Sequence, residues 1–392
     1  MSTLKVDGIR SNGDTSGNDT ITLADNTTCT ANITNRQNRN LIINGAMQVA
    51  QRGTSSTTNG FGTVDRFIIW YDNTDEAPTQ AQADVASGTT PYTLGFRKSY
   101  KITNGNQTSG AGTDDVIQFA TKLEAQDIAN SGWNYTSASS FITLSFWVKS
   151  SVAQTFYVNL RTDDGTSQNF PFSTGSLSAD TWTKVTQKIP GNANLVFNND
   201  NGEGLEIIFT LYRGTDTTGS VTLGAWAAHN NSTRVPDFGT ANDDWYLAND
   251  ATFEITGLQL EVSDYATDFE HRSYGVEKRL CMRYYQEYKN IQMAGYIPDN
   301  NARAYALGFN FPVEFRAAPT LTISNTGSSS GQMIQDGETG GKITTLVSTG
   351  MTSYNAEINV NLHADMTNYR PAVASSAGWT TNETKYMFNG EL

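Results

Sequence analysis

Short runs of alternating apolar and polar residues recur along the chain, and helical periodicity is almost absent. In FITLSFWVKS, Leu144, Phe146 and Val148 share one side of an extended strand, and the residues between them take the other. LEIIFTLYRG repeats the pattern from Leu205 to Leu211. Gly, Asn and Asp bound most of these runs, which is typical of antiparallel sandwiches and barrels. The pattern therefore predicts an all-β protein.

The strand pattern divides the 392 residues into four parts. Residues 1–39 contain two short strands and too few apolar side chains to bury a core alone. Residues 40–275 hold nine or more strands, a number that suits a jelly-roll β-sandwich. Residues 276–289 are expected to form a connecting helix. Residues 290–392 are expected to form a smaller, sandwich-like β domain.

One strand changes its apolar phase in mid-course. In ATFEITGLQLEV the apolar positions shift from Phe253 and Ile255 to Leu258 and Leu260. The shift falls at Gly257, where an extra residue can enter the ladder. We therefore predict a β-bulge at Gly257.

The expected helix carries apolar residues at every fourth position. Val276, Leu280, Tyr284 and Tyr288 form one stripe, with Cys281 beside it. The stripe predicts a joint between two β domains. If the helix packs around a threefold axis, the same residues are where three chains would meet.

Composition excludes several kinds of partner. A net charge of −13 and a pI near 4.7 argue against binding to nucleic acid, which needs a basic face. No apolar run approaches membrane-spanning length, and the N-terminus lacks a secretory profile. With two cysteines and three histidines, neither a disulfide scaffold nor a Cys/His zinc cluster is expected.

Motifs for catalysis are weak. The string GSSSG, residues 327–331, matches G-x-S-x-G but lies in a loop between strands, not at a strand-to-helix elbow. Adjacent carboxylates such as Asp114 and Asp115 point apart in a strand, so they do not indicate a glycosidase pair. No cofactor is expected. Acidic turns at Asp163-Asp164-Gly165 and around Asp200 leave structural calcium open, although hairpin turns explain them equally well.

Aromatic residues offer the best binding chemistry. Sugars present apolar C–H faces that stack on such rings. Trp226, Trp245 and Tyr246 flank the loop AAHNNSTRVPDFGTANDD, and His229 begins it, so these four residues are the candidate glycan ligands. The competing interpretation is that the rings fill the core and that His229 is a solvated loop residue.

Several motifs, in order, resemble marine bacteriophage tail-fibre and receptor-binding proteins. They are LKVDGI with NDTITLADNTT, NLIINGAMQVAQRG with VDRF, FITLSFWVKSS, FEITGLQLEVSDYATDFEHRSYGVEKRLCMRYYQEY, and FPVEFRAAPTLTIS with the terminal NGEL. Glu314-Phe315 departs from the Pro-Met that the family places before the arginine.

The resemblance implies a carbohydrate-binding-module-like jelly roll in a virion component assembled in the host cytoplasm. It further implies a homotrimer that attaches through residues 1–39 to a tail adaptor, nozzle or other virion protein. The distal domains would face a host surface polysaccharide. A core-poor N-terminal segment also favours an oligomer on physical grounds, because it gains burial only by pairing with other chains.

Three functions remain open at this stage. The first is a receptor-binding adhesin without enzymatic activity, whose weak sites gain avidity from several copies. The second is a structural fibre that decorates the capsid or tail. The third is a polysaccharide depolymerase, which needs two carboxylates brought together from different strands or chains.

Overall fold

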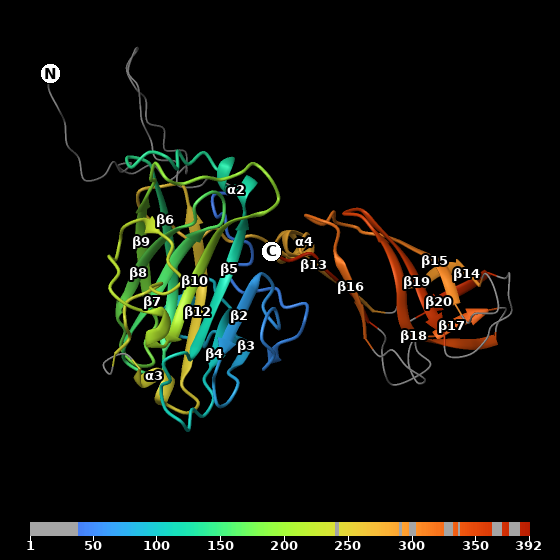
Figure 1. Cartoon of the computed structure of the whole chain (residues 1–392), viewed down its shortest axis with the longest axis horizontal. Coiled ribbons are helices and arrows are strands. Elements are labelled where there is room, and N and C mark those ends of the chain that lie inside the picture. The colour runs from blue at the N-terminus through green and yellow to red at the C-terminus, as the bar shows by residue number, and fades with distance from the viewer. Residues whose placement is uncertain are drawn as a thin grey trace, which may run out of the picture. The chain divides into compact units, whose positions relative to one another are not determined.

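The computed structural model describes residues 38–239, 243–289, 292–297, 303–324, 332–335, 338–362, 371–375 and 385–392. The expected attachment segment therefore lies outside the described residues, except for Asn38 and Arg39. Strands dominate the described chain, so the predicted all-β class is confirmed (Figure 1).

Two six-stranded sheets form the jelly-roll sandwich predicted within residues 40–275. The β12 sheet has the order β1 (Ser55–Ser56), β3 (Thr79–Asp84), β4 (Lys98–Thr103), β12 (Thr252–Glu261), β6 (Phe141–Ser150), β9 (Thr183–Pro190). The β10 sheet has the order β11 (Ala227–Ala228), β8 (Gln168–Ser176), β7 (Thr155–Thr162), β10 (Glu203–Arg213), β5 (Val116–Glu124), β2 (Phe67–Asp72). Most neighbours are distant in sequence, so the chain crosses repeatedly between the sheets.

The core between these sheets follows the predicted alternation. Leu144, Phe146 and Val148 on β6 are fully buried. On β10, Phe209 stacks on Phe119 of β5 with ring centroids 4.7 Å apart, and Phe146 meets Phe209 edge to face. Each such side chain contributes roughly 1.5–3 kcal/mol by leaving water. The sandwich thus rests on the strand faces that the sequence pattern identifies.

The β-bulge predicted in β12 is present. The register between β12 and β6 shifts between Thr256 and Gln259. Gly257 has φ +64°, and a Cβ there would lie 2.6 Å from Cζ of Phe96. Backbone conformation and space therefore both require glycine at this position.

We expect Gly257→Ala to destabilise the protein by roughly 2–3 kcal/mol, because it adds left-handed strain and a clash with Phe96. The matched control is Gly275→Ala, which lies in a helix with open space around it and should be neutral or stabilising by about 0.5–1 kcal/mol. Urea unfolding of both variants measures the difference, and equal effects would contradict the bulge argument.

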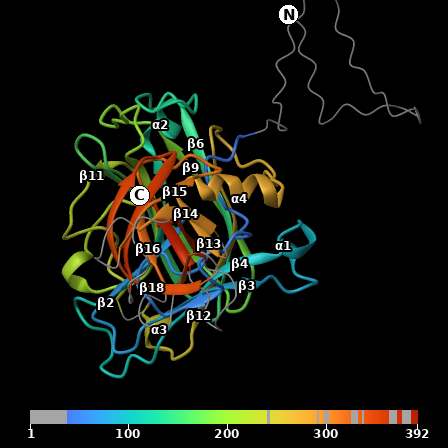
Figure 2. The same cartoon turned by 90° about the vertical axis from the view of Figure 1, so that its right-hand side faces the viewer.

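The connecting helix is shorter than the predicted 276–289. The helix α4 spans Tyr274–Met282, and its Ser273 cap accepts a hydrogen bond from the Val276 amide. Tyr285 already begins β13 (Tyr285–Lys289), so Tyr284 and Tyr288 do not extend a helical stripe (Figure 2). The residues that α4 buries are Glu277 and Cys281, whereas Val276 is 50% exposed and Leu280 half-buried. The predicted stripe is therefore wrong.

Tertiary hydrogen bonds explain where α4 ends. The carbonyl of Arg283 accepts from the Arg316 amide, and that of Tyr284 accepts from the Gly390 amide. These partners replace the next helical turn and direct the chain into β13. The other short helices are α1 (Thr90–Thr93), α2 (Ala125–Ala129), η1 (Thr215–Thr217) and α3 (Asp244–Leu247).

The C-terminal part is all-β, as expected, and has two sheets. A three-stranded sheet has the order β13, β21 (Lys385–Asn389), β16 (Thr320–Ile323). A closed barrel has the order β14 (Gln292–Tyr296), β15 (Arg303–Asn310), β19 (Asn355–Leu362), β18 (Glu338–Met351), β17 (Gln332–Gln335), β20 (Pro371–Ser375). Leu307, Ile358 and Phe388 are fully buried in its separate core.

Buried charges tie the sandwich to this C-terminal part. Arg283 donates from Nε and Nη2 to the two oxygens of Glu124, each at 2.8 Å, and the Tyr284 hydroxyl donates to Glu124 at 2.6 Å. Arg66 stacks on the Tyr284 ring, with Cζ 3.4 Å from its centroid, and forms an ion pair with Glu391. We call Arg66, Glu124, Arg283, Tyr284 and Glu391 the joint cluster.

We expect Arg283→Ala to destabilise the protein by roughly 2–4 kcal/mol, because it leaves the fully buried Glu124 carboxylate without its cation. The 31% exposure of the Arg283 side chain places the value toward the lower end. Lys188→Ala removes an exposed pair with Asp264 and should change stability by no more than about 0.5 kcal/mol. Calorimetric unfolding compares the two, and a similarly small effect of Arg283→Ala would contradict the role of the joint cluster.

Candidate functional site

The outer face of the β10 sheet carries a mixed aromatic and polar surface. Trp70 on β2 lies opposite Gln118 on β5, which lies opposite Thr210 on β10. The inward neighbours of Trp70, such as Ile69, fill the core, so strand alternation turns the Trp70 ring outward. Trp70 is 52% exposed, and its surroundings include apolar residues such as Ile68 and Val116 as well as polar ones.

The segment between β10 and α3 covers part of this face. Phe238 packs edge to face on Tyr157 of β7, with ring centroids 5.1 Å apart, and Val235 bridges to Thr218. Because Phe238 and Val235 are buried, this segment acts as a fixed wall beside the open strands β2 and β5.

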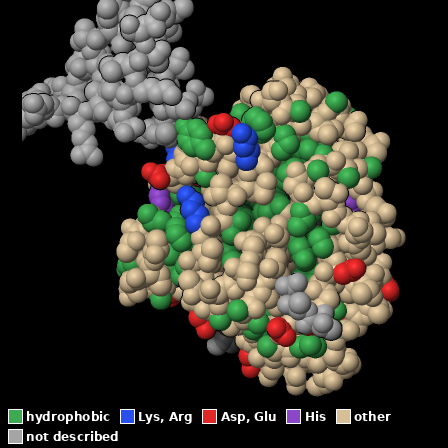
Figure 3. Space-filling model, turned by 90° about the vertical axis from the view of Figure 1, so that its left-hand side faces the viewer, with side chains coloured by type: hydrophobic (Ala, Val, Ile, Leu, Met, Phe, Trp, Pro, Cys, Tyr) green, Lys and Arg blue, Asp and Glu red, His purple; other side chains and the backbone are tan. Residues whose placement is uncertain are grey.

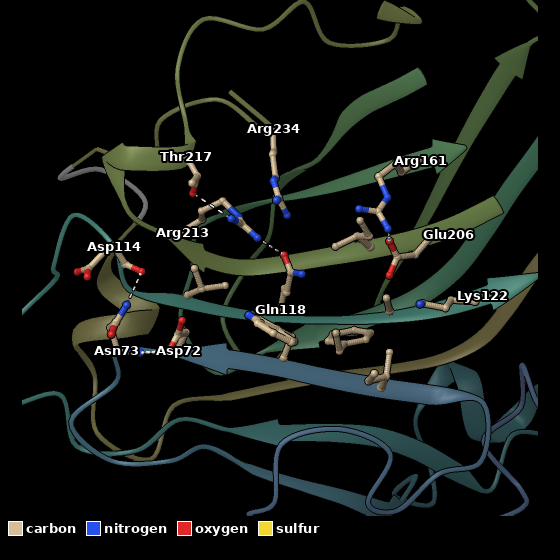
Figure 4. A pocket seen from close by; sticks show the side chains of 16 residues that line it. Asp72, Asn73, Asp114, Gln118, Lys122, Arg161, Glu206, Arg213, Thr217 and Arg234 are labelled. Carbon is tan, nitrogen blue, oxygen red and sulfur yellow. Dashed lines mark hydrogen bonds and ion pairs between the residues drawn. The ribbon is translucent and has the colours of Figure 1, made fainter. Parts of the chain in front are cut away.

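The wall and the strands enclose a cavity of about 590 Å³. Figure 4 shows Gln118 and Arg213 on its floor, with Arg234 reaching in from the wall. The full lining is Ile68, Trp70, Asp72, Asn73, Asp114, Val116, Gln118, Phe119, Ala120, Lys122, Arg161, Glu206, Ile208, Arg213, Thr217 and Arg234. Its size and its mixed lining are typical of a small-molecule or sugar site.

Charges at one end of the cavity are paired. Arg161 donates to Glu206 at 2.8 Å and lies 3.5 Å from Glu203. Lys122 reaches Glu203 at 2.7 Å. Burial raises the pKa of Glu206, and the nearby Arg161 opposes that shift.

The middle of the cavity holds two further arginines with neutral partners. Arg213 donates to the Thr217 hydroxyl at 2.9 Å and to the Gln118 side-chain oxygen. Arg234 donates to the Asn231 side-chain oxygen at 2.8 Å. Burial, and then the charge of Arg234, lowers the pKa of Arg213 to about 10, so Arg213 is a cation at neutral pH. Burial also lowers the pKa of Arg234.

The predicted ligands Trp245 and Tyr246 do not lie in an accessible loop. Trp245 is 0% and Tyr246 1% exposed, because both belong to α3, whose rings enter the sandwich core. The Tyr246 ring stacks on that of Tyr212 with centroids 4.0 Å apart, and the Tyr246 hydroxyl donates a 2.8 Å hydrogen bond to the Asp115 carboxylate. The expected setting is therefore wrong, and neither ring has a free face for a sugar.

Trp226 and His229 are partly buried at the edge of the β10 sheet. Trp226 donates from Nε1 to the Pro190 carbonyl at 2.7 Å and packs on Phe170. His229 lies 3.1 Å from the Asn231 side-chain oxygen, and burial and three nearby arginines lower its pKa. Neither residue lines the cavity, although Asn231 links His229 to Arg234.

The predicted site residues did not include Trp70, Gln118, Arg213 or Arg234. For Trp70 a signal was present, because in DRFIIWYD it shares a strand face with Ile68 and Asp72, while the other face holds Phe67 and Ile69. The arginines gave no comparable signal, since Arg213 follows a register irregularity between Thr210 and Tyr212 and Arg234 arrives from an irregular segment.

Two of the acidic residues considered from the sequence, Asp115 and Asp164, have hydrogen-bond partners within the fold. Asp114 and Asp115 lie just before β5 and not within a strand; Asp115 is buried and accepts a hydrogen bond from Tyr246, while Asp114 is exposed. Asp164 accepts two hydrogen bonds from Asn198, so its turn has a structural role. Among the residues that the structure describes, no group of three or more His, Cys, Asp or Glu side chains is placed to hold a metal ion.

Some of the other residues named from the sequence lie outside the described part of the chain. Cys281 is buried, which raises the pKa of its thiol well above the usual value, while Cys29 and the GSSSG string lie outside the described residues. Among the helices that are described, none has the length and apolar character needed to span a membrane.

Comparison with known proteins yields structural similarities only. No family model and no curated protein matches the sequence. The chain aligns with the enzymatically active domain of tailspike protein 4 from bacteriophage CBA120 at 10% identity and a TM-score of 0.29, covering 57% of this chain and 22% of that one.

Two carbohydrate-binding structures also align. The cellulose-binding domain of Cellulomonas fimi β-1,4-glucanase C gives 11% identity and a TM-score of 0.27, covering 55% of this chain and 98% of that one. The family 11 carbohydrate-binding module of Clostridium thermocellum gives 11% identity and a TM-score of 0.24, covering 56% of this chain and 98% of that one. TM-scores this low do not establish a shared fold. The sandwich is therefore assigned from its own strand pairing.

Proposed function

We propose that the protein is a receptor-binding adhesin without enzymatic activity that holds a glycan in the cavity on the outer face of the β10 sheet. The observation that carries the proposal is the exposed ring of Trp70, which stands beside a row of hydrogen-bonding side chains. A sugar stacks its apolar face on such a ring while its hydroxyls bond to groups such as Gln118 and Asn73.

A site of this kind is open and holds its ligand weakly. Weak sites are useful on a multivalent particle, where several copies multiply the affinity without new contacts. The sequence motifs quoted above, which resemble tail-fibre proteins, support placing the protein in a virion as a homotrimer that attaches through residues 1–39. A decoration fibre that binds no glycan is the alternative.

We expect Trp70→Ala to weaken binding to host surface polysaccharide about tenfold or more, because the stacking surface is lost. Tyr354→Ala is the matched control: it removes an exposed ring, 62% exposed, from the C-terminal part and should leave binding unchanged. Affinity electrophoresis measures both variants, with circular dichroism to confirm folding.

The opposite result, loss of binding in Tyr354→Ala alone, would move the site to the C-terminal part. If wild-type protein binds no host polysaccharide, the decoration fibre is favoured. Shortening of the polysaccharide during the incubation would overturn the non-enzymatic proposal in favour of a depolymerase.

We expect the full chain to have three times the mass of one chain in solution, because residues 1–39 gain burial by pairing with identical neighbours. Light scattering coupled to size exclusion measures the mass. A monomer at micromolar concentration contradicts the trimer. A variant without residues 1–37 should keep the sandwich folded, which Trp fluorescence reports, but lose attachment to virions.

A further inference from the structure

Two arginines that line the cavity form no ion pair with a described residue. Among the described residues, Arg213 and Arg234 bond only to the neutral side chains of Thr217, Gln118 and Asn231. Their Nε atoms are inaccessible and have no hydrogen-bond partner. Arg213 is only 5% exposed. A buried guanidinium without a carboxylate is unfavourable, and its burial is offset only when a ligand or neighbour supplies negative charge.

No described acid near the cavity forms an ion pair with Arg213 or Arg234, although the charge of Glu206 acts on Arg234 and opposes the lowering of its pKa. Glu206 lies 2.8 Å from Arg161, and Glu203 is shared between Arg161 and Lys122. At the other end, Asp72 accepts a hydrogen bond from the Asn73 amide, and the carbonyl of Asp114 accepts one from the Asn73 side chain. Arg161 thus shows the pairing that Arg213 and Arg234 lack.

Arg316 likewise forms no ion pair with a described residue, but its guanidinium donates to the backbone carbonyls of Asn201 and Gly390. Only 17% of residues are charged, and Figure 3 shows a face of the molecule where uncharged groups predominate. Arg213 and Arg234 thus have no ion pair with a described residue in a chain of net charge −13, in which acids outnumber basic residues.

The two arginines are positioned beside the proposed stacking ring. Gln118 lies opposite Trp70 across the β2–β5 pair and accepts a hydrogen bond from Arg213. Arg234 points from the wall into the same space (Figure 4). A sugar stacked on Trp70 can therefore direct a substituent of its ring toward both guanidiniums.

We propose that this cavity selects anionic glycans, whose carboxylate or sulfate group binds Arg213 and Arg234. The inference rests on the proposed glycan binding and adds the class of sugar. Guanidinium groups form strong charge-assisted hydrogen bonds with carboxylate and sulfate oxygens. Because the whole chain is acidic, this attraction is local and acts only after the sugar enters the cavity.

The test compares three polymers of similar length: a polyuronate, a sulfated polysaccharide and a neutral β-glucan. Calorimetry measures their binding to the wild type, Arg234→Gln, Arg213→Lys and Lys184→Gln. Arg234 is partly exposed, so its variant should fold even if Arg213→Lys does not. Lys184→Gln removes the same charge from an exposed position on β9 of the other sheet.

We expect one of the two acidic polymers to bind best and Arg234→Gln to weaken it about tenfold, with Lys184→Gln unchanged. Preference for the polyuronate identifies a carboxylate, and preference for the sulfated polymer a sulfate. Equal or stronger binding of the neutral glucan, unaffected by Arg234→Gln, overturns the anionic selectivity and leaves glycan binding intact. Failure of all three polymers to bind overturns both proposals.

Discussion

The organisation of the chain depends on one buried carboxylate, Glu124, at the end of β5. Its side chain is fully buried and accepts hydrogen bonds from both Arg283 and Tyr284. Burial raises the pKa of a carboxyl, but here the hydrogen bonds from Arg283 and Tyr284 outweigh burial and hold the pKa of Glu124 below its usual value. The charge is therefore retained, and it fixes the residues at which α4 ends and β13 begins.

The motifs that resemble tail-fibre proteins lie far apart in sequence but meet around this carboxylate. Asn44 donates its amide proton to Glu277, and Arg52 bonds Glu391 at 3.2 Å. Arg316 donates to the carbonyls of Gly390 and Glu391. The quoted stretches around residues 40–53, 64–67, 274–288 and 311–324 and the terminal NGEL thus describe one joint. Their shared chemistry explains how the two β parts are held and carries no information about a ligand.

Strand alternation predicted the sandwich because each inward side chain, such as Phe146 or Phe209, is decided locally by its position in the pleat. It also located the bulge, since Gly257 marks a change of phase. The helix was harder to predict. Val276, Leu280, Tyr284 and Tyr288 have helical spacing, but carbonyls at Arg283 and Tyr284 find partners more than thirty residues away. A local sequence pattern does not reveal that these distant hydrogen bonds replace the next helical turn.

The residues of the candidate site were also only partly predictable from local sequence. Trp245 and Tyr246 flank a polar loop, which suggested exposure, yet the short helix α3 inserts both rings into the core. Trp70 was recoverable, because the two-residue period of a strand places it on the same face as Asp72, opposite the buried Phe67 and Ile69. Arg213 and Arg234 could not be paired from sequence, because the wall that brings Arg234 over β10 is an irregular segment held by Phe238 and Val235.

The joint cluster and the cavity both contain arginines, but these arginines differ in their partners. In the joint cluster, Arg66 and Arg283 are each matched by an acid and a tyrosine, so the charges are satisfied and the geometry is fixed. In the cavity, Arg213 and Arg234 bond to neutral groups and keep unsatisfied donors. Because a guanidinium without an ion pair gains more from an anionic ligand than one that is already paired, the proposed recognition of an anionic sugar fits the cavity better than the joint cluster.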